Sequence, residues 1–192
     1  MNLLKLVTLL SLATSLLLAA PKTKENTQIK ALIKMGQTSS KLLLKTLASN
    51  MKKNMKAGGP LQALDFCSQE AYTLTEKVNQ KLPNGVRVKR ISSKFRNPAN
   101  KPTGNEQVVL ESLQKLKDAN ILLPKQLIQK VDANTYKYYK PLIIKKQVCL
   151  KCHGDVKETD LKRAIAERYP IDKAMHYKMG DLRGAIVVTI TK

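Results

Sequence analysis

Between residues 27 and 56, apolar side chains recur at steps of three and four residues, with Gly36 and Ser40 on the same stripe. That spacing predicts a long amphipathic helix. Its apolar positions are Ile29, Leu32, Ile33, Leu43, Leu44, Leu47, Met51 and Met55. Gly58-Gly59-Pro60 is expected to end the helix, because glycine provides a left-handed cap and proline cannot continue the hydrogen-bond ladder.

A second helix is expected to begin near Leu61 and to carry one cysteine on its apolar face. That face is made of Leu64, Cys67, Ala71, Leu74 and Val78. The pattern therefore points the Cys67 thiol toward the protein interior and away from water.

Strand and turn signals become more frequent in the middle of the chain. Asn84-Gly85 predicts a turn, and residues 86–88 after it alternate as a strand does. Thr103 with Glu106 forms the capping-box pattern that begins a short helix. The chain therefore leaves its long helical part before residue 84.

The last third of the chain is rich in strand signals. Residues 135–139 and 141–148 contain many aromatic and β-branched side chains and are predicted to form two strands. Residues 159–169 are predicted to form a helix, and residues 177–191 a hairpin that turns at Gly180. Helices come first and strands later, which favours an α+β fold with an antiparallel sheet over a four-helix bundle.

Residues 1–20 have the pattern of a secretory signal peptide: Lys5 supplies the charged end, a Leu-rich stretch follows at residues 6–18, and small residues end it. Cleavage is expected after Ala20, with an uncleaved N-terminal anchor as the alternative. The remaining residues 21–192 suit a single domain with a hydrophobic core. We therefore expect a periplasmic or otherwise extracytoplasmic protein.

The chain is strongly basic, with 35 Lys+Arg against 14 Asp+Glu and a formal net charge of +21. Such a charge favours contact with an anionic membrane surface or an acidic redox partner, although a solvated Lys-rich surface also explains it. Nucleic acid is not an expected partner, because lysines are spread along the chain and aromatic residues make up only 4%.

The most specific chemical signal is the pentapeptide Cys149-Leu150-Lys151-Cys152-His153. C-x-x-C-H is the pattern by which a c-type haem is attached. Two thiols at this spacing each form a thioether with a haem vinyl group, and the following histidine becomes an axial ligand of the iron. The sequence therefore predicts one covalently attached haem c held by Cys149, Cys152 and His153.

Two other uses of the same residues remain open. A zinc site is conceivable from Cys67, Cys149, Cys152 and one histidine, but a second short-spaced ligand pair is missing. A thioredoxin-like disulfide requires C-x-x-C at the start of a helix in a βαβ unit, which the surrounding pattern does not provide. The export signal also favours haem.

Four segments resemble the family of exported PAS-like domains that carry one c-type haem, a family long described as a domain of unknown function. They are residues 61–67 (LQALDFC), residues 96–100 (RNPAN), the Cys149–His153 motif and residues 180–185 (GDLRGA), and they occur in the family's order. Members of that family occur alone or as sensor domains of histidine kinases and chemoreceptors.

The resemblance implies a PAS-like antiparallel sheet with long N-terminal helices packed against it. It also implies a haem ligated by a histidine on one side and a cysteine thiolate on the other, which are His153 and Cys67 in this chain. The chemistry of the residues agrees, because Fe(III) lowers the pKa of a sheltered thiol and holds it as thiolate. An anionic sulfur ligand also favours ferric iron and a low reduction potential.

Other residues compete for the second ligand position or for contact with the haem. His176 is the alternative distal ligand, and a methionine is a further one, although Met35, Met51 and Met55 fit an ordinary packed helix. Arg96 is a candidate partner for a haem propionate. A solvated loop arginine is the simpler interpretation of the same residue.

We therefore expect a redox or diatomic-gas (NO, CO or O2) sensor that works with a redox partner or signalling protein. The alternative is a periplasmic electron-transfer cytochrome c with His/His or His/Met ligation. We do not expect an enzyme, because no hydrolytic motif is present. Peroxidase chemistry would need an open iron site with a distal acid–base group, for which His176 is the candidate. A structural module recruited to anionic surfaces by charge is a third possibility.

Overall fold

The computed structural model describes residues 20–192, and the side chains from Glu25 onward. The predicted signal segment lies outside the described residues, apart from Ala20. The chain divides into two compact units, Met1–Ala31 and Leu32–Lys192, and the fold described below is that of the second unit. In the part of the chain that is described, no helix is both long and apolar enough to cross a membrane.

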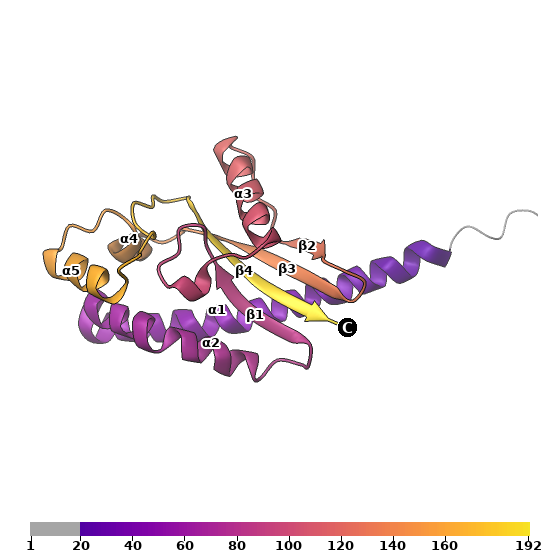
Figure 1. Ribbon diagram of the computed structural model, residues 1–192, viewed down its shortest axis with the longest axis horizontal. Helices are drawn as coiled ribbons and strands as arrows, with labels where there is room; N and C mark the ends of the chain where they lie inside the picture. The colour runs from indigo at the N-terminus through magenta and orange to yellow at the C-terminus, as the bar shows by residue number, and fades with distance from the viewer. Residues whose placement is uncertain (1–19) are drawn as a thin grey trace, which may run out of the picture. The chain divides into compact units, whose positions relative to one another are not determined.

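A four-stranded antiparallel sheet forms the centre of this unit (Figure 1). Its strands are β1 (Val86–Ile91), β2 (Leu127–Lys130), β3 (Thr135–Ile143) and β4 (Leu182–Thr191), in the spatial order β1-β4-β3-β2. Every neighbouring pair is antiparallel. The predicted α+β class with an antiparallel sheet is confirmed, and β2 is a strand that the sequence pattern did not indicate.

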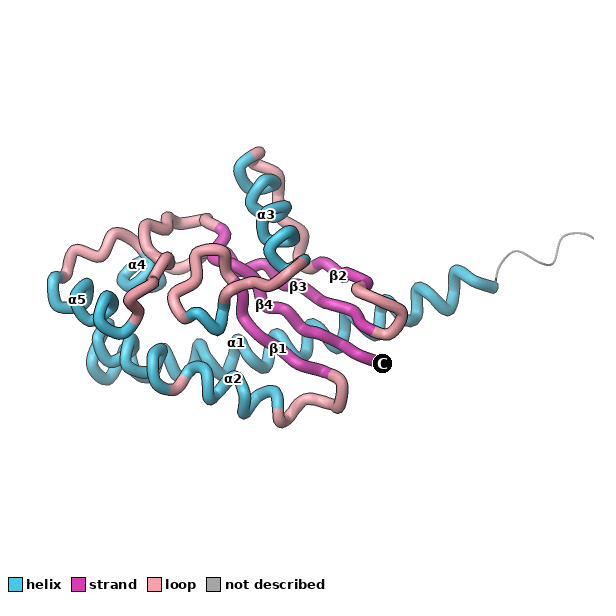
Figure 2. The backbone as a smooth tube through the Cα atoms, viewed as in Figure 1, coloured by secondary structure: helices cyan, strands magenta, loops and turns pink. Residues whose placement is uncertain are grey.

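Helices surround the sheet (Figure 2). They are α1 (Ala20–Gln69), α2 (Ala71–Asn79), α3 (Asn105–Asp118), α4 (Gln147–His153) and α5 (Thr159–Arg168), with a short 3-10 turn, η1, at Pro98–Asn100. The helix ladder of α1 is interrupted where predicted, because Gly58 and Gly59 have non-helical backbone angles and Gly59 has a φ of 68°. The expected pair of N-terminal helices is therefore confirmed.

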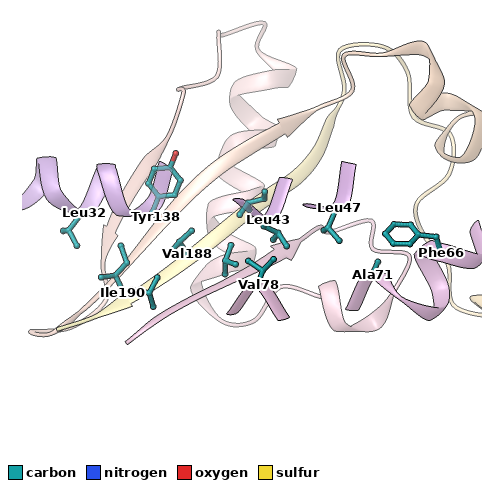
Figure 3. Close-up of a cluster of buried hydrophobic side chains, with 12 residues drawn as sticks. Leu32, Leu43, Leu47, Phe66, Ala71, Val78, Tyr138, Val188 and Ile190 are labelled. Atoms are coloured by element: carbon teal, nitrogen blue, oxygen red, sulfur yellow. The ribbon is translucent and has the colours of Figure 1, made fainter. Parts of the chain in front are cut away.

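The N-terminal helices pack against one face of the sheet, as expected (Figure 3). The core between them contains Leu32, Leu43, Leu47, Phe66, Ala71, Val78, Val86, Val88, Tyr138, Ile186, Val188 and Ile190. A glycine is required where α1 approaches β3, since a Cβ on Gly36 would lie 2.2 Å from Cγ of Tyr138. The apolar stripe predicted from the sequence is thus the stripe that meets the sheet.

The opposite face of the sheet is covered by α3. Leu110 packs there with Ile91, Tyr139 and Val187. Glu106, in the first turn of α3, accepts a hydrogen bond from the backbone N–H of Thr103, which confirms that half of the predicted capping box. Its carboxylate is also paired with lysines of β1 and β3, although it is only 1% exposed.

Two local predictions near the C-terminal part are wrong. The strand predicted at residues 141–148 ends at Ile143, and Val148 lies in the helix α4. The predicted hairpin at residues 177–191 is a single strand, β4, preceded by a loop. Gly180 donates its backbone N–H to the carbonyl of Ile144, and Asp181 accepts from the N–H of Ile144, so the chain around Gly180 bonds to the segment after β3 and does not fold back on β4.

Candidate cofactor site

A cavity of about 200 Å³ brings together all five residues that the sequence singled out for haem binding. Cys67, Arg96, Cys149, Cys152 and His153 all line it, although they come from three separate parts of the chain. The volume lies below the roughly 300–1,000 Å³ typical of small-molecule sites. A group of haem size would therefore extend from this cavity to solvent.

The C-x-x-C-H motif occupies most of the short helix α4. Residues three apart on a helix lie on the same side, so this helix presents Cys149 and Cys152 together. Gly154 ends the helix by donating its N–H to the carbonyl of Leu150. Although the motif lies in a helix, the sheet around it is antiparallel, so the βαβ setting of thioredoxin-like proteins is not formed.

His153 is held in the form that suits a metal ligand. Its Nδ1 lies 2.9 Å from the backbone carbonyl of Ala174, and because a carbonyl only accepts, Nδ1 carries the proton. The lone pair is therefore on Nε2. Burial, followed by the nearby charges of Arg183 and Arg96, lowers the pKa of His153 well below its ordinary value, so the ring is neutral at neutral pH.

Cys67 reaches the same cavity from the end of α1. Burial raises the pKa of the Cys67 thiol, while Arg90 and Arg96 act in the opposite direction. Cys67, Cys149 and Cys152 are not joined by a disulfide. In the described part of the chain, no three His, Cys, Asp or Glu side chains form a group suited to a metal ion alone, as the zinc alternative would require.

Arg96 is buried and is used mainly to hold the end of the motif. Its Nη2 donates to the carbonyl of Cys152 at 2.7 Å and pairs with Asp172 at 3.0 Å. Its Nε is buried without a hydrogen-bond partner. The solvated-loop interpretation of Arg96 is therefore wrong.

Two further arginines, Arg90 and Arg183, line the cavity. The sequence patterns had not identified either of them as a site residue. The Nε of Arg90 is also buried without a hydrogen-bond partner. A signal for Arg90 was present, because it alternates in phase with Val86 and Val88 and so shares their inward face. No such signal existed for Arg183, which lies at a β-bulge where Leu142 pairs with Gly184 but the next residue pairs with Leu182.

The charges around the cavity are strongly unbalanced. Three guanidinium groups line it, and no carboxylate does. Among the described residues, the acid that forms an ion pair with one of them is Asp172, which is paired with Arg96. Burial lowers the pKa of both Arg90 and Arg183, which shows the cost of keeping these cations away from water. The cavity is therefore suited to a group with more than one negative charge.

His176 lies outside this cavity. Its side chain is 75% exposed, and Nδ1 is 2.5 Å from Oδ1 of the equally exposed Asp155. Its φ of 62° places its backbone in the left-handed region. Met51 and Met55, in contrast, line the cavity. Among the described methionines they are therefore the candidates for an iron ligand.

A larger cleft of about 400 Å³ lies between α2 and β1. It shares Arg90, Asn97 and Asn100 with the cavity, but it contains none of the predicted ligands. The three thiols and the imidazole of His153 therefore all line the smaller cavity, and none of them lines the larger cleft.

The chain is similar to a described protein family and to a solved structure. The family model described as Tll0287-like matches residues 18–191. The crystal structure of the cyanobacterial heme-protein Tll0287 superimposes with a TM-score of 0.60 at 21% sequence identity, covering 91% of this chain and 98% of that one. The comparison with curated protein sequences gave no match.

Proposed function

The chain belongs to the Tll0287-like family, and we propose that it is an exported mono-haem c-type protein that senses redox state or a diatomic gas. Cys149 and Cys152 hold the haem covalently, and His153 and Cys67 ligate its iron. The observation that carries the proposal is the convergence of these four residues on one cavity lined by three arginines.

The residues present fit a haem in their donor set and in their charge. Thiols at i and i+3 beside a histidine with a free Nε2 provide the attachment and one axial ligand. Three positive charges, those of Arg90, Arg96 and Arg183, line the cavity, and Asp172 compensates one of them. Two haem propionates would neutralise the remaining positive charge. The guanidinium groups in the cavity wall are the candidates for those contacts.

A bound haem would supply a one-electron Fe(III)/Fe(II) couple and, once a ligand leaves, a coordination position for a diatomic gas. Cys67 determines which of these dominates. Its thiolate is stabilised by ferric iron and by Arg90 and Arg96. With reduced iron the buried sulfur would lie beside less positive charge, so Cys67 would be held less firmly than with ferric iron. Weaker binding of Cys67 would be the change that a sensor needs.

The alternative function is electron transfer with His153 and a methionine as ligands. It is favoured by the position of Met51 and Met55 in the cavity wall. A carrier keeps both ligands in both oxidation states, because this keeps reorganisation small. The two functions therefore differ in what the sixth ligand does on reduction.

The surface of α1 suggests how a partner reaches this site. Lys34, Lys41, Lys45, Lys52 and Lys56 lie along one exposed stripe of the helix, which we call the lysine stripe. No acidic residue occurs between Glu25 and Asp65. Lys52 and Lys56 directly follow Met51 and Met55, which line the cavity, so an acidic redox or signalling protein docked on the stripe would lie near the cavity. A membrane is less favoured, since the apolar face of α1 is already used in the core.

The proposal is tested by producing the chain in a host that attaches c-type haem and measuring protein mass, absorption and CO binding after reduction. A sensor is expected to carry one covalent haem and to bind CO rapidly only in the reduced state. Slow or absent CO binding would favour the carrier. Absence of covalent haem from the native chain, with the attachment system active, would contradict both functions.

A further inference from the structure

The carbonyl of Ala174 is the acceptor that fixes the tautomer of His153, and it is completely buried. It also accepts a hydrogen bond from Nη2 of Arg96 at 3.3 Å. One backbone oxygen thus connects a predicted iron ligand with a buried cation. Whatever holds this oxygen in place also holds the His153 ring.

Asp172 holds the turn that presents this oxygen. Its Oδ1 accepts the backbone N–H of Ala174 at 2.8 Å, which closes a tight Asx-type turn. Its Oδ2 accepts from Arg96 at 3.0 Å, and both side chains are only 8% exposed. Asp172 does not line the cavity, and its side chain is connected to the site through Ala174 and Arg96.

The segment after this turn runs alongside the end of α4. The N–H of Tyr177 donates to the carbonyl of His153 at 2.9 Å, and the N–H of His176 donates to that of Gly154 at 3.2 Å. These two hydrogen bonds hold the backbone of His153 and Gly154 without using the side chain of Asp172. Asp172 in addition fixes the Ala174 carbonyl, which accepts the hydrogen bond from the imidazole of His153.

The charges of Asp172 and Arg96 act in opposite directions on His153. Nη2 of Arg96 has two hydrogens but four acceptors within 3.3 Å, so its bonds are shared between them. Its positive charge draws electron density from the Ala174 carbonyl and weakens that acceptor for His153. The carboxylate of Asp172 compensates this effect.

We propose that Asp172 is a positioning residue that sets the orientation and donor strength of His153 through the Ala174 carbonyl. This inference rests on the proposed function, in which Nε2 of His153 binds the iron. Groups that hydrogen-bond to the free nitrogen of a ligating histidine raise its basicity and fix its ring. Asp172 and Arg96 extend that control one step further from the metal.

The two charges give predictions of opposite sign. Asp172→Asn keeps an acceptor for Ala174 but leaves Arg96 uncompensated, so the reduction potential should rise. Arg96→Gln leaves the charge of Asp172, so the potential should fall. We expect each change to alter the ratio of oxidised to reduced haem at fixed potential by about tenfold, the lower end of outer-shell effects. General loosening of the site would move both variants in the same direction.

The experiment uses haem-loaded native protein, both variants and Asp160→Asn, a control that loses an exposed ion pair on α5. Covalent haem is first verified by mass, and if the native protein has none, the proposed function fails and not this inference alone. Potentials are then titrated. Opposite shifts with an unchanged control support the proposal, and unchanged potentials or shifts of one sign in both variants overturn it.

A second measurement does not depend on the variants folding. In the native haem protein, the Nδ1–H proton of His153 should give a slowly exchanging NMR signal, because its acceptor is buried and held. Exchange at the rate of free imidazole would overturn the proposal.

Discussion

Gly36 on α1 faces the ring of Tyr138 on β3 so closely that a methyl group there would lie 2.2 Å from Cγ and 2.3 Å from Cδ2. Tyr138 is completely buried, with the sheet behind it. The missing side chain of Gly36 therefore sets how near the long helix comes to the sheet.

Gly36→Ala should destabilise the protein even though alanine favours helices. The propensity gain is about 1 kcal/mol, whereas overpacking a core costs roughly 1–3 kcal/mol. We expect a net loss, because the ring of Tyr138 has no space to move into. Denaturant unfolding measures it, with Gly58→Ala as the control, since a Cβ there meets first the flexible end of Gln62. Equal midpoints for both variants and the native chain would contradict the account.

Acid should weaken the attachment of α3 to the sheet through Glu106. Burial raises the pKa of this carboxyl, but hydrogen bonds from Lys137, Lys89 and Thr103 outweigh it and lower the pKa below the usual 4.5. The stabilisation is therefore complete above that value and is lost as pH falls through the lower pKa of the folded state. Glu106→Gln should cost about 1.5–3 kcal/mol at neutral pH.

The difference between native and Glu106→Gln stability should shrink as the pH is lowered below 4. The exposed Glu111 on the same helix provides the matched control, Glu111→Gln. A difference that stays constant from pH 7 to pH 3 would contradict the assigned direction of the shift.

Arg90→Met should affect haem-free and haem-loaded protein in opposite ways. Without an anion in the cavity, the buried Nε lacks a partner, and removing it relieves a desolvation cost. The haem-free form should then melt at a higher temperature, while the haem-loaded form loses a propionate contact and should melt at a lower one. Arg87→Met, on the exposed side of the same strand, is the control. A decrease of similar size in both forms would contradict the role of Arg90.

These residues show what the sequence could and could not predict. The helix break at Gly58-Gly59 and the inward face of Cys67 depend on local spacing, and both were predictable. The sequence wrongly predicted a strand at Val148, because β-branched residues favour strands locally. In the structure Val148 lies in α4 and lines the cavity. Arg183 was not predictable, since a bulge in β4 depends on pairing with a distant strand.

The lysine stripe should dominate the electrostatic binding of the protein. The triple change Lys45, Lys52 and Lys56 to Gln should lower the salt concentration that elutes the protein from a cation exchanger. A control triple with the same net charge, at the exposed Lys77, Lys81 and Lys115, should change it less. Equal elution of the two triples would show a uniformly solvated charge. Phosphatidylglycerol vesicles distinguish a membrane from a protein partner, and strong binding to them would overturn the preference for an acidic protein.

Ligation of one covalently attached haem by His153 and Cys67 is tested by optical and EPR spectroscopy of native protein, Cys67→Ala and His176→Ala from a host that attaches c-type haem. We expect a low-spin thiolate signature that disappears in Cys67→Ala while the covalent haem remains, and that is unchanged in His176→Ala. An unchanged spectrum in Cys67→Ala would show that Cys67 does not ligate the iron.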